Sequence, residues 1–269
     1  MISADLHVHT NFSSDSNTSV EMQIEKAASI GLQTICITDH QDFDYPSRIQ
    51  GPEYQLDVNK YFKKMNDMKN IYKEKIEVLT GVELGLMPNL KEKIQNFTKK
   101  YDFDFLIGSS HLVNGKDPYF RSFYENRIEK EAYNEYFISI LENVKKFDEY
   151  NIYGHLDYVV RYGPNKNKFF EFKDYAETIE EILKIIISKG KGIEINTSGL
   201  LRSLGYPHPH GEILKMYKKL GGEIITIGSD AHVSENIGFE FNTIENLLKN
   251  YGFKYYVVFR KRTPTFYKI

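Results

Sequence analysis

Histidine and carboxylate side chains recur in short motifs along this chain, and each motif follows a run of apolar residues. Six of the eight histidines fall in these motifs. The motifs are His7-Val8-His9 with Asp15 behind it, Thr38-Asp39-His40, Gly81-Val82-Glu83, Ser110-His111, Gly154-His155 and Ser229-Asp230-Ala231-His232. Imidazoles mixed with carboxylates suit divalent zinc, manganese or iron. If the motifs meet at one end of a sheet, they build a multinuclear metal centre, and we expect a metallohydrolase.

The spacing within the motifs supports this interpretation. His7 and His9 are two residues apart on a strand continuation, so both rings project to the same side, and Asp230 and His232 repeat that spacing. Glu83 follows an apolar run in which an unpaired carboxylate would be costly. Bridging two cations with its two oxygens would remove that cost. We interpret Asp39 as a residue that orients a ligand rather than binding a metal.

Composition narrows the class of protein. The chain has 269 residues, 41% of them hydrophobic, which suits one large domain spanning residues 1–269. Its net charge of -2 gives no electrostatic footprint for nucleic acid or for an anionic membrane surface. The single cysteine, Cys36, excludes an intrachain disulfide, and we find neither a signal peptide nor a membrane-spanning run. We therefore expect a cytoplasmic protein, and the sequence leaves its oligomeric state open.

The elements that must position these motifs alternate along the chain. The predicted strands are Ile2–Leu6, Thr34–Thr38, Glu77–Gly81, Phe103–Gly108, Ile152–His155, Gly192–Ile195 and Ile224–Ile227. The predicted helices include Ser19–Ile30, Val58–Tyr72, Arg127–Tyr150, Asp174–Ser188 and Ile213–Leu220. Strand–helix repetition predicts an α/β fold with a parallel sheet, and seven units without a midpoint reversal favour a closed barrel. The tail Phe253–Ile269 is expected to add a strand or a packed extension.

Long aromatic loops and two arginines are the candidates for substrate binding. The insertions after Asp42 and Leu112 are rich in Tyr and Phe and are expected to wall the substrate site. Arg161 and Arg202 lie in loops after strands, where a planar guanidinium suits bidentate contact with phosphate. The two remaining histidines, His208 and His210, precede a helix among prolines, and we expect a capping or surface role for them.

Together the motifs resemble those of the polymerase and histidinol phosphatase (PHP) superfamily, from His7 to His232. The segment from Thr38 to Pro46 and the overall length resemble the histidinol-phosphatase branch. The resemblance implies a distorted (β/α)7 barrel in a single domain, with three divalent ions (Zn, Mn or Fe). It implies one ion on His7, His9, Glu83 and Asp230, a second on Glu83, His111 and His155, and a third on Asp15, His40 and His232. The position of Asp15 is often histidine in this superfamily, and both residue types can bind a metal.

The function that this resemblance implies is hydrolysis of L-histidinol phosphate to L-histidinol and phosphate in histidine biosynthesis. Metal-activated hydroxide would attack phosphorus, with Glu83, Asp230 and His232 as the catalytic residues. Arg161 and Arg202 would neutralise the phosphoryl group. Asp42, with neighbouring Phe43 and Tyr45, is the candidate for the imidazole and ammonium groups of the substrate.

Three alternatives remain at this stage. A phosphoesterase of the same superfamily could act on nucleotides or short nucleic acids, although the near-neutral charge argues against it. A catalytically silent binding module would have lost some ligands, whereas the full set of nine is present. A carbon–nitrogen hydrolase is disfavoured because, by analogy, amidohydrolases carry different strand motifs. We expect a small-molecule phosphomonoester as the substrate, with no nucleic-acid or membrane partner.

Overall fold

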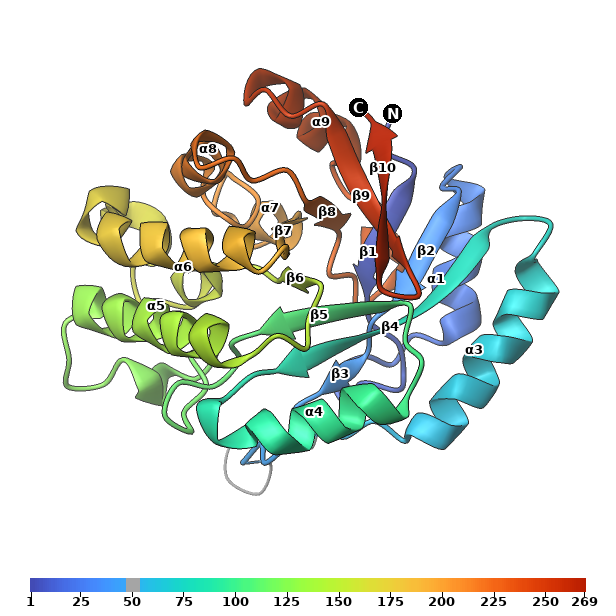
Figure 1. Cartoon of the computed structure of the whole chain (residues 1–269), viewed down its shortest axis with the longest axis horizontal. Helices are drawn as coiled ribbons and strands as arrows, with labels where there is room; N and C mark the ends of the chain where they lie inside the picture. Colours follow the sequence, from blue (N-terminus) through green and yellow to red (C-terminus); the bar gives the residue numbers. More distant parts are fainter. Residues whose placement is uncertain (47–53) are drawn as a thin grey trace.

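Seven parallel strands form a nearly closed barrel and follow one another in the order of the chain (Figure 1). They are β1 Ala4–Val8, β2 Thr34–Ile37, β4 Glu77–Gly85, β5 Phe105–Ser109, β6 Ile152–Tyr153, β7 Gly192–Asn196 and β8 Ile225–Gly228. The ring closes where Val8 bridges Ala231 and the His9 N–H donates to the Ala231 carbonyl at 3.0 Å. This computed structural model describes residues 1–46 and 54–269. The predicted distorted seven-stranded α/β barrel is confirmed.

A short strand that was not predicted, β3 His40–Gln41, continues the path of β2 after a break at Thr38 and Asp39. It pairs with β4, so that His40 lies beside Glu83. On the other side of β4, Glu83 pairs with Ile107 of β5. The third predicted strand was expected to end at Gly81, but β4 continues to Gly85. Glu83 is therefore held inside the sheet by neighbours on both sides.

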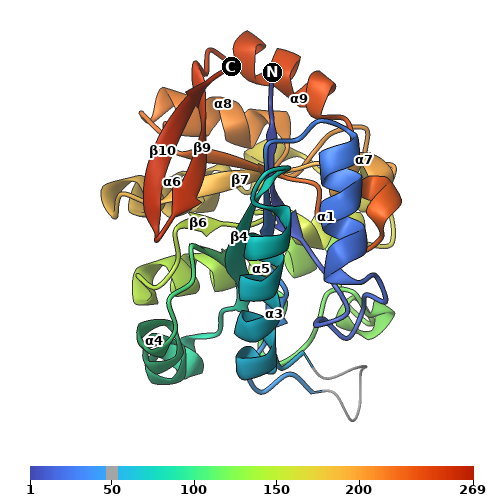
Figure 2. The same cartoon turned by 90° about the vertical axis from the view of Figure 1, so that its right-hand side faces the viewer.

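Helices cover the outside of the barrel, as Figures 1 and 2 show. They are α1 Val20–Ser29, α3 Val58–Tyr72, α4 Lys91–Lys100, α5 Glu129–Lys146, α6 Ala176–Ser188, α7 Ser198–Leu201, α8 Gly211–Lys219 and α9 Phe241–Asn250. Single 3₁₀ turns occur at Pro88–Leu90, Arg121–Phe123, Tyr158–Arg161, Lys166–Phe169, Phe172–Asp174 and Ser234–Asn236. Helix α3 buries Tyr61, Met65, Met68 and Tyr72, whose spacing gives one apolar stripe. The predicted helices are confirmed, with α5 shorter than expected.

The C-terminal segment forms an antiparallel hairpin of β9 Tyr255–Arg260 and β10 Thr263–Lys268. Arg260 donates two bonds of 2.6 Å to Glu77, the first residue of β4, and the Arg262 N–H donates to the Asp104 carbonyl just before β5. The hairpin therefore packs at the amino ends of these strands, away from the motifs. The predicted packed extension is confirmed.

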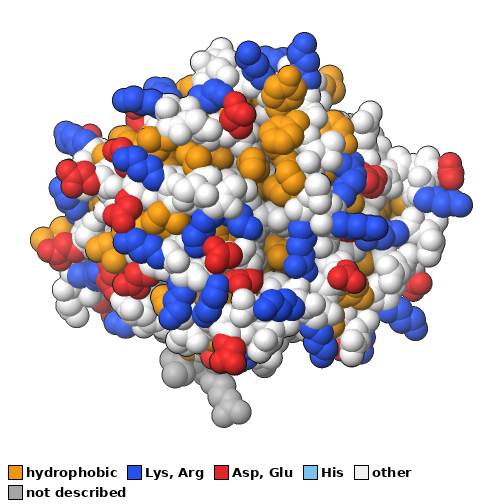
Figure 3. All heavy atoms as spheres, viewed as in Figure 1, with side chains coloured by type: hydrophobic (Ala, Val, Ile, Leu, Met, Phe, Trp, Pro, Cys, Tyr) orange, Lys and Arg blue, Asp and Glu red, His pale blue; other side chains and the backbone are white. Residues whose placement is uncertain are grey.

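The charge pattern of the surface and the hydrophobicity of the helices are relevant to possible partners. On the face seen in Figure 3, acidic and basic side chains are interspersed rather than gathered by sign. Within residues 1–46 and 54–269, no helix is long and apolar enough to cross a membrane.

Candidate metal centre

The structure brings together all nine side chains that the sequence singled out as metal ligands. They lie within or just after strands β1, β3, β4, β5, β6 and β8, at the carboxyl ends of the barrel strands, with Asp15 in the loop after β1. Barrel enzymes build their active sites at this end. The side chains are His7, His9, Asp15, His40, Glu83, His111, His155, Asp230 and His232.

Glu83 occupies the middle of the cluster, with two imidazoles facing Oε1 and three facing Oε2. Its Oε2 lies 3.1 Å from Nδ1 of His40, 3.2 Å from Nε2 of His7 and 3.4 Å from Nε2 of His9. Its Oε1 lies 3.1 Å from Nε2 of His111 and 3.0 Å from Nε2 of His155. The Glu83 side chain is only 1% exposed. One buried carboxylate therefore joins two groups of nitrogen donors.

Asp230 completes the group around His7 and His9. Its Oδ1 lies 3.7 Å from Nε2 of His7 and 3.3 Å from Nε2 of His9. Asp230 has a φ of 55°, in the left-handed region that a residue with a side chain adopts only at a cost. Its N–H donates to the His7 carbonyl at 2.8 Å, which stabilises this conformation. The backbone strain is localised at a residue whose carboxylate faces the cluster.

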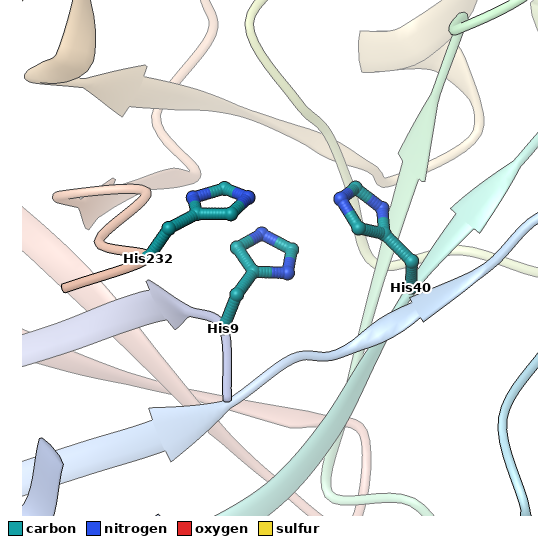
Figure 4. A group of neighbouring side chains, drawn as sticks. All are labelled: His9, His40 and His232. Carbon is teal, nitrogen blue, oxygen red and sulfur yellow. The ribbon is translucent and has the colours of Figure 1, made fainter. Parts of the chain in front are cut away.

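A third group of donors lies closer to solvent. Oδ2 of Asp15 is 3.0 Å from Nε2 of His232 and 3.6 Å from Nε2 of His40. The His9 ring stacks on the rings of both His40 and His232 at 4.3 Å, and Figure 4 shows these three imidazoles converging from separate segments. Since the side chains of His232 and Asp15 are 28% and 30% exposed, this group forms the outer edge of the cluster.

Burial and neighbouring charges shift the pKa values of these groups in the metal-free chain. Burial alone would raise the pKa of Glu83, but His7 and His111 outweigh it and hold that pKa well below the usual range. Burial and the neighbouring His232 and His40 lower the pKa of His9 to about 3. Carboxylates thus stay ionised at neutral pH, and His9 stays neutral. Burial would lower the pKa values of His7, His40 and His111, but the facing carboxylates outweigh it and raise them, so these rings release a proton when they bind a metal.

The donor set fits divalent cations. Ligand atoms about 2.0–2.1 Å from a tetrahedral zinc are about 3.3–3.4 Å from one another, and the separations in the cluster run from 3.0 to 3.7 Å. Four overlapping sets of three donors have all their ligand atoms within 4.8 Å of one another. Oε2 of Glu83 is buried and receives no hydrogen bond. Nitrogens of His7, His9 and His40 lie 3.1 to 3.4 Å from this oxygen, and a cation held among them would offset the cost of burying it.

The two arginines lie beside this cluster in different surroundings. Arg161 is buried, and its Nη1 donates to Oγ of Ser198 at 2.8 Å and to Oδ2 of Asp230 at 3.3 Å. Its guanidinium lies over the rings of Tyr158 and Tyr162, 4.5 and 4.9 Å from their centroids. Its Nε has no hydrogen-bond partner. Arg202 is exposed and lines the same cavity.

A cavity of about 380 Å³ opens on these candidate ligands and is lined by both arginines. Asp42 and the loops that follow it and Leu112 contribute acidic or aromatic lining residues: Asp42, Tyr45, Tyr54, Asp117, Tyr119 and Phe120. The expectation that these loops wall the site is confirmed for their described residues; residues 47–53 of the first loop lie outside them. The cavity thus combines cationic, anionic and aromatic surfaces.

Several polar contacts around the cluster were not predicted. Asp42 was predicted to bind substrate, and its Oδ2 lies 2.7 Å from Nδ1 of His111. Glu194 of β7, absent from the sequence prediction, lies 2.6 Å from Nδ1 of His7. A charged residue inside an otherwise apolar buried strand was the available signal. Asp117 was also not predicted, because no sequence motif distinguishes it within the loop after Leu112.

Three other polar residues, His208, His210 and Asp39, were given structural roles by the sequence, and the structure shows their contacts. His210 caps α8 by accepting from the Glu212 N–H, as predicted. The predicted capping or surface role is wrong for His208, which is fully buried with Nδ1 2.5 Å from Oδ1 of Asp157. Asp39 accepts from Oγ of Ser13 at 2.6 Å, and that hydroxyl lies 3.3 Å from Nδ1 of His9. This agrees with an orienting role for Asp39.

Comparisons with known proteins match this geometry. The model of the PHP domain family matches residues 5–198. A histidinol-phosphatase of Lactococcus lactis is 36% identical over 250 residues, which is 93% of this chain and 91% of that protein. A probable histidinol-phosphatase of Clostridium acetobutylicum is 35% identical over 258 residues, covering 96% and 97% of the two chains. The crystal structure of histidinol phosphate phosphatase from L. lactis, complexed with zinc, L-histidinol and phosphate, superposes with a TM-score of 0.90 at 33% identity, covering 98% of each chain.

Proposed function

The chain belongs to the PHP domain family, and from that premise we propose that it hydrolyses L-histidinol phosphate to L-histidinol and phosphate with a centre of three divalent ions. The observation that carries the proposal is the arrangement around Glu83, with nine metal-binding side chains at one end of the barrel and a cavity that opens on them. The similarity to a histidinol-phosphatase across most of both chains supports the choice of substrate.

We assign the donors to three ions as the resemblance to the PHP superfamily implies. His7, His9, Glu83 and Asp230 would hold the first. The second would be held by Glu83, His111 and His155, and the third by Asp15, His40 and His232. When bound, such ions activate water as a nucleophile and polarise phosphoryl oxygens. Zinc is supported as the identity by the relative that binds it.

The arginines supply the remaining positive charge for the phosphoryl group. Arg161 is fixed by Ser198, Asp230 and two tyrosine rings, so its unused donors are already oriented. A preorganised guanidinium stabilises charge in the transition state without further ordering. Arg202 is exposed at the cavity and can adjust to the phosphoryl oxygens.

The acidic and aromatic wall suits the cationic end of the substrate. Asp117 is buried at the cavity, where its Oδ2 accepts from the Tyr45 hydroxyl and its Oδ1 from the Tyr119 N–H, both at 2.7 Å. These donors fix the carboxylate and leave lone pairs for an ammonium or imidazolium group. Aromatic faces beside a cation add further stabilisation. We place the cationic groups of L-histidinol phosphate against Asp117 and Asp42.

Removal and restoration of metal test the proposal. Protein stripped with a chelator should release no phosphate from L-histidinol phosphate, and added zinc or manganese should restore turnover as the ions bind. Full activity of the metal-free protein would overturn the metal mechanism. Preferential hydrolysis of nucleotides or oligonucleotides would replace the proposed substrate. The cytoplasmic location expected from the sequence stays a prediction.

A further inference from the structure

Glu194 is a buried carboxylate that the metal assignment does not use. It lies in β7 with only 1% of its side chain exposed, and no lysine or arginine of the described residues pairs with it. Its Oε1 lies 2.6 Å from Nδ1 of His7. Its Oε2 accepts from the His155 N–H and from Nδ2 of Asn196, both at 3.1 Å. Leaving such a group buried has a cost that its contacts must offset.

We propose that Glu194 is a positioning residue that orients His7 and fixes His155, ligands of two different ions; this rests on the metal centre proposed above. A carboxylate that accepts from Nδ1 keeps the remaining proton of His7 on that nitrogen when Nε2 binds an ion. The Nε2 lone pair then points into the cluster, 3.2 Å from Oε2 of Glu83. Carboxylates that hold metal-binding imidazoles in this way fix the tautomer and raise the basicity of the ligand.

The second oxygen of Glu194 contacts the main chain of His155, whose ring also packs against Tyr158 with centroids 5.0 Å apart. Nδ1 of His155 is buried without a hydrogen-bond partner. The bond from its main-chain N–H to Glu194 therefore helps to hold this ligand near Oε1 of Glu83. One carboxylate thus sets the positions of ligands on both sides of the bridging Glu83.

The neighbouring strand leaves space for this contact. A Cβ added at Gly228 would lie 2.3 Å from Cβ of His7 and 2.5 Å from Oε1 of Glu194. Any larger residue at position 228 would collide with His7 and Glu194, so glycine is needed there for these two side chains to make contact. The same arrangement recurs at His111, whose Nδ1 lies 2.7 Å from Asp42, beside Gly85.

Asp157 provides a matched control. It pairs with His208 at 2.5 Å, and both side chains are fully buried, but His208 is not one of the cluster ligands. Asp157→Asn therefore removes an equally buried carboxylate–imidazole contact without touching a ligand ring. Glu194→Gln keeps the size of the side chain but cannot satisfy both sets of donors.

The experiment is competition of each zinc-loaded protein against a chromophoric chelator, with zinc counted per chain. Glu194→Gln should weaken the ion on His7 by about tenfold to a hundredfold, with a smaller loss at the ion on His155. The ion on Asp15, His40 and His232 should stay, and Asp157→Asn should keep all ions at wild-type affinity. Unchanged affinity in Glu194→Gln, equal loss of every ion, or the same loss in Asp157→Asn would overturn the proposal.

A measurement on the wild-type protein keeps the test independent of whether a variant folds. Histidine nitrogen NMR of the zinc-loaded chain should show His7 protonated at Nδ1 and bound through Nε2. A His7 ring without a proton on Nδ1 would refute the role of Glu194. If the wild-type chain binds no zinc, the metal centre and this inference both fall; if it binds zinc and only the Glu194 predictions fail, the metal centre stands.

Discussion

Arg161 and Asp230 form a buried ion pair at the edge of the metal cluster, with Nη1 of the arginine 3.3 Å from Oδ2 of the aspartate. The other oxygen of Asp230, Oδ1, lies 3.3 Å from Nε2 of His9. A residue proposed to bind phosphate thus contacts a residue proposed to bind metal. Arg202 makes no such contact among the described residues, so the two arginines should respond differently to substitution.

Arg202→Ala should lower kcat/KM for L-histidinol phosphate about tenfold to a hundredfold, because a hydrogen bond to a charged group contributes about 1.5–3 kcal/mol. Its metal content should equal that of the wild type. Arg161→Ala should lower kcat/KM further and also weaken metal retention, because it removes the hydrogen bond that orients the Asp230 carboxylate. Steady-state kinetics with elemental analysis of both variants check this, and equal metal content in the two would contradict the coupling.

Glu83→Ala should remove the bridge between two proposed ions. One oxygen of Glu83 faces His111 and His155, and the other faces His7, His9 and His40. We therefore expect the variant to lose at least one ion, together with activity. The outer group of Asp15, His40 and His232 should be affected least. Elemental analysis after exhaustive dialysis measures the change. A variant that retains three ions would show that Glu83 bridges nothing.

Asp117→Asn should impair recognition of the cationic end of the substrate alone. Loss of a charge-assisted contact predicts a tenfold to hundredfold drop in kcat/KM for L-histidinol phosphate. Turnover of a small aryl phosphate without positive charge should change little, because the phosphate subsite is untouched. Parallel kinetics on the two substrates separate these effects, and an equal drop on both would mean that Asp117 serves the fold.

The metal-free protein should lose stability as pH rises from about 6.5 to about 10. Burial would lower the pKa of His111, but Asp42 and Glu83 outweigh it and raise that pKa from 6.5 to about 10. The folded state therefore holds a proton that the unfolded state releases in this window. The stabilisation is complete below pH 6.5 and disappears as pH passes 10. Thermal melts of chelator-treated protein across this range test the sign; a Tm that rises with pH would contradict it.

Much of the site could be predicted because its residues follow strands that the apolar pattern reveals. Eight of the nine metal-binding candidates stand within or just after a buried run, Asp15 follows in the loop after β1, and parallel strands bring such positions to one end. The contacts of Glu194 with His7 and of Asp42 with His111 could not be predicted, because they join residues far apart in the chain through side-chain direction. The buried contact between His208 and Asp157 could not be predicted for the same reason.

Two parts of the fold were also missed for physical reasons. Helix α9 was not predicted, because its short stripe of Phe241, Ile244 and Leu248 is weak evidence by itself and becomes stable only by packing on the barrel. Strand β3 has two residues and depends on its pairing with β4. Local pattern cannot reveal an element that exists only through its neighbours.

The central claim is that this metal centre serves L-histidinol phosphate, and the most direct measurement compares kcat/KM for that substrate with kcat/KM for a nucleoside monophosphate on the same metal-loaded protein. Phosphate release reports both reactions. The acidic and aromatic wall around Asp117 predicts a preference for L-histidinol phosphate of at least about a hundredfold. Equal or faster turnover of the nucleotide would contradict the account and indicate a phosphoesterase for another substrate.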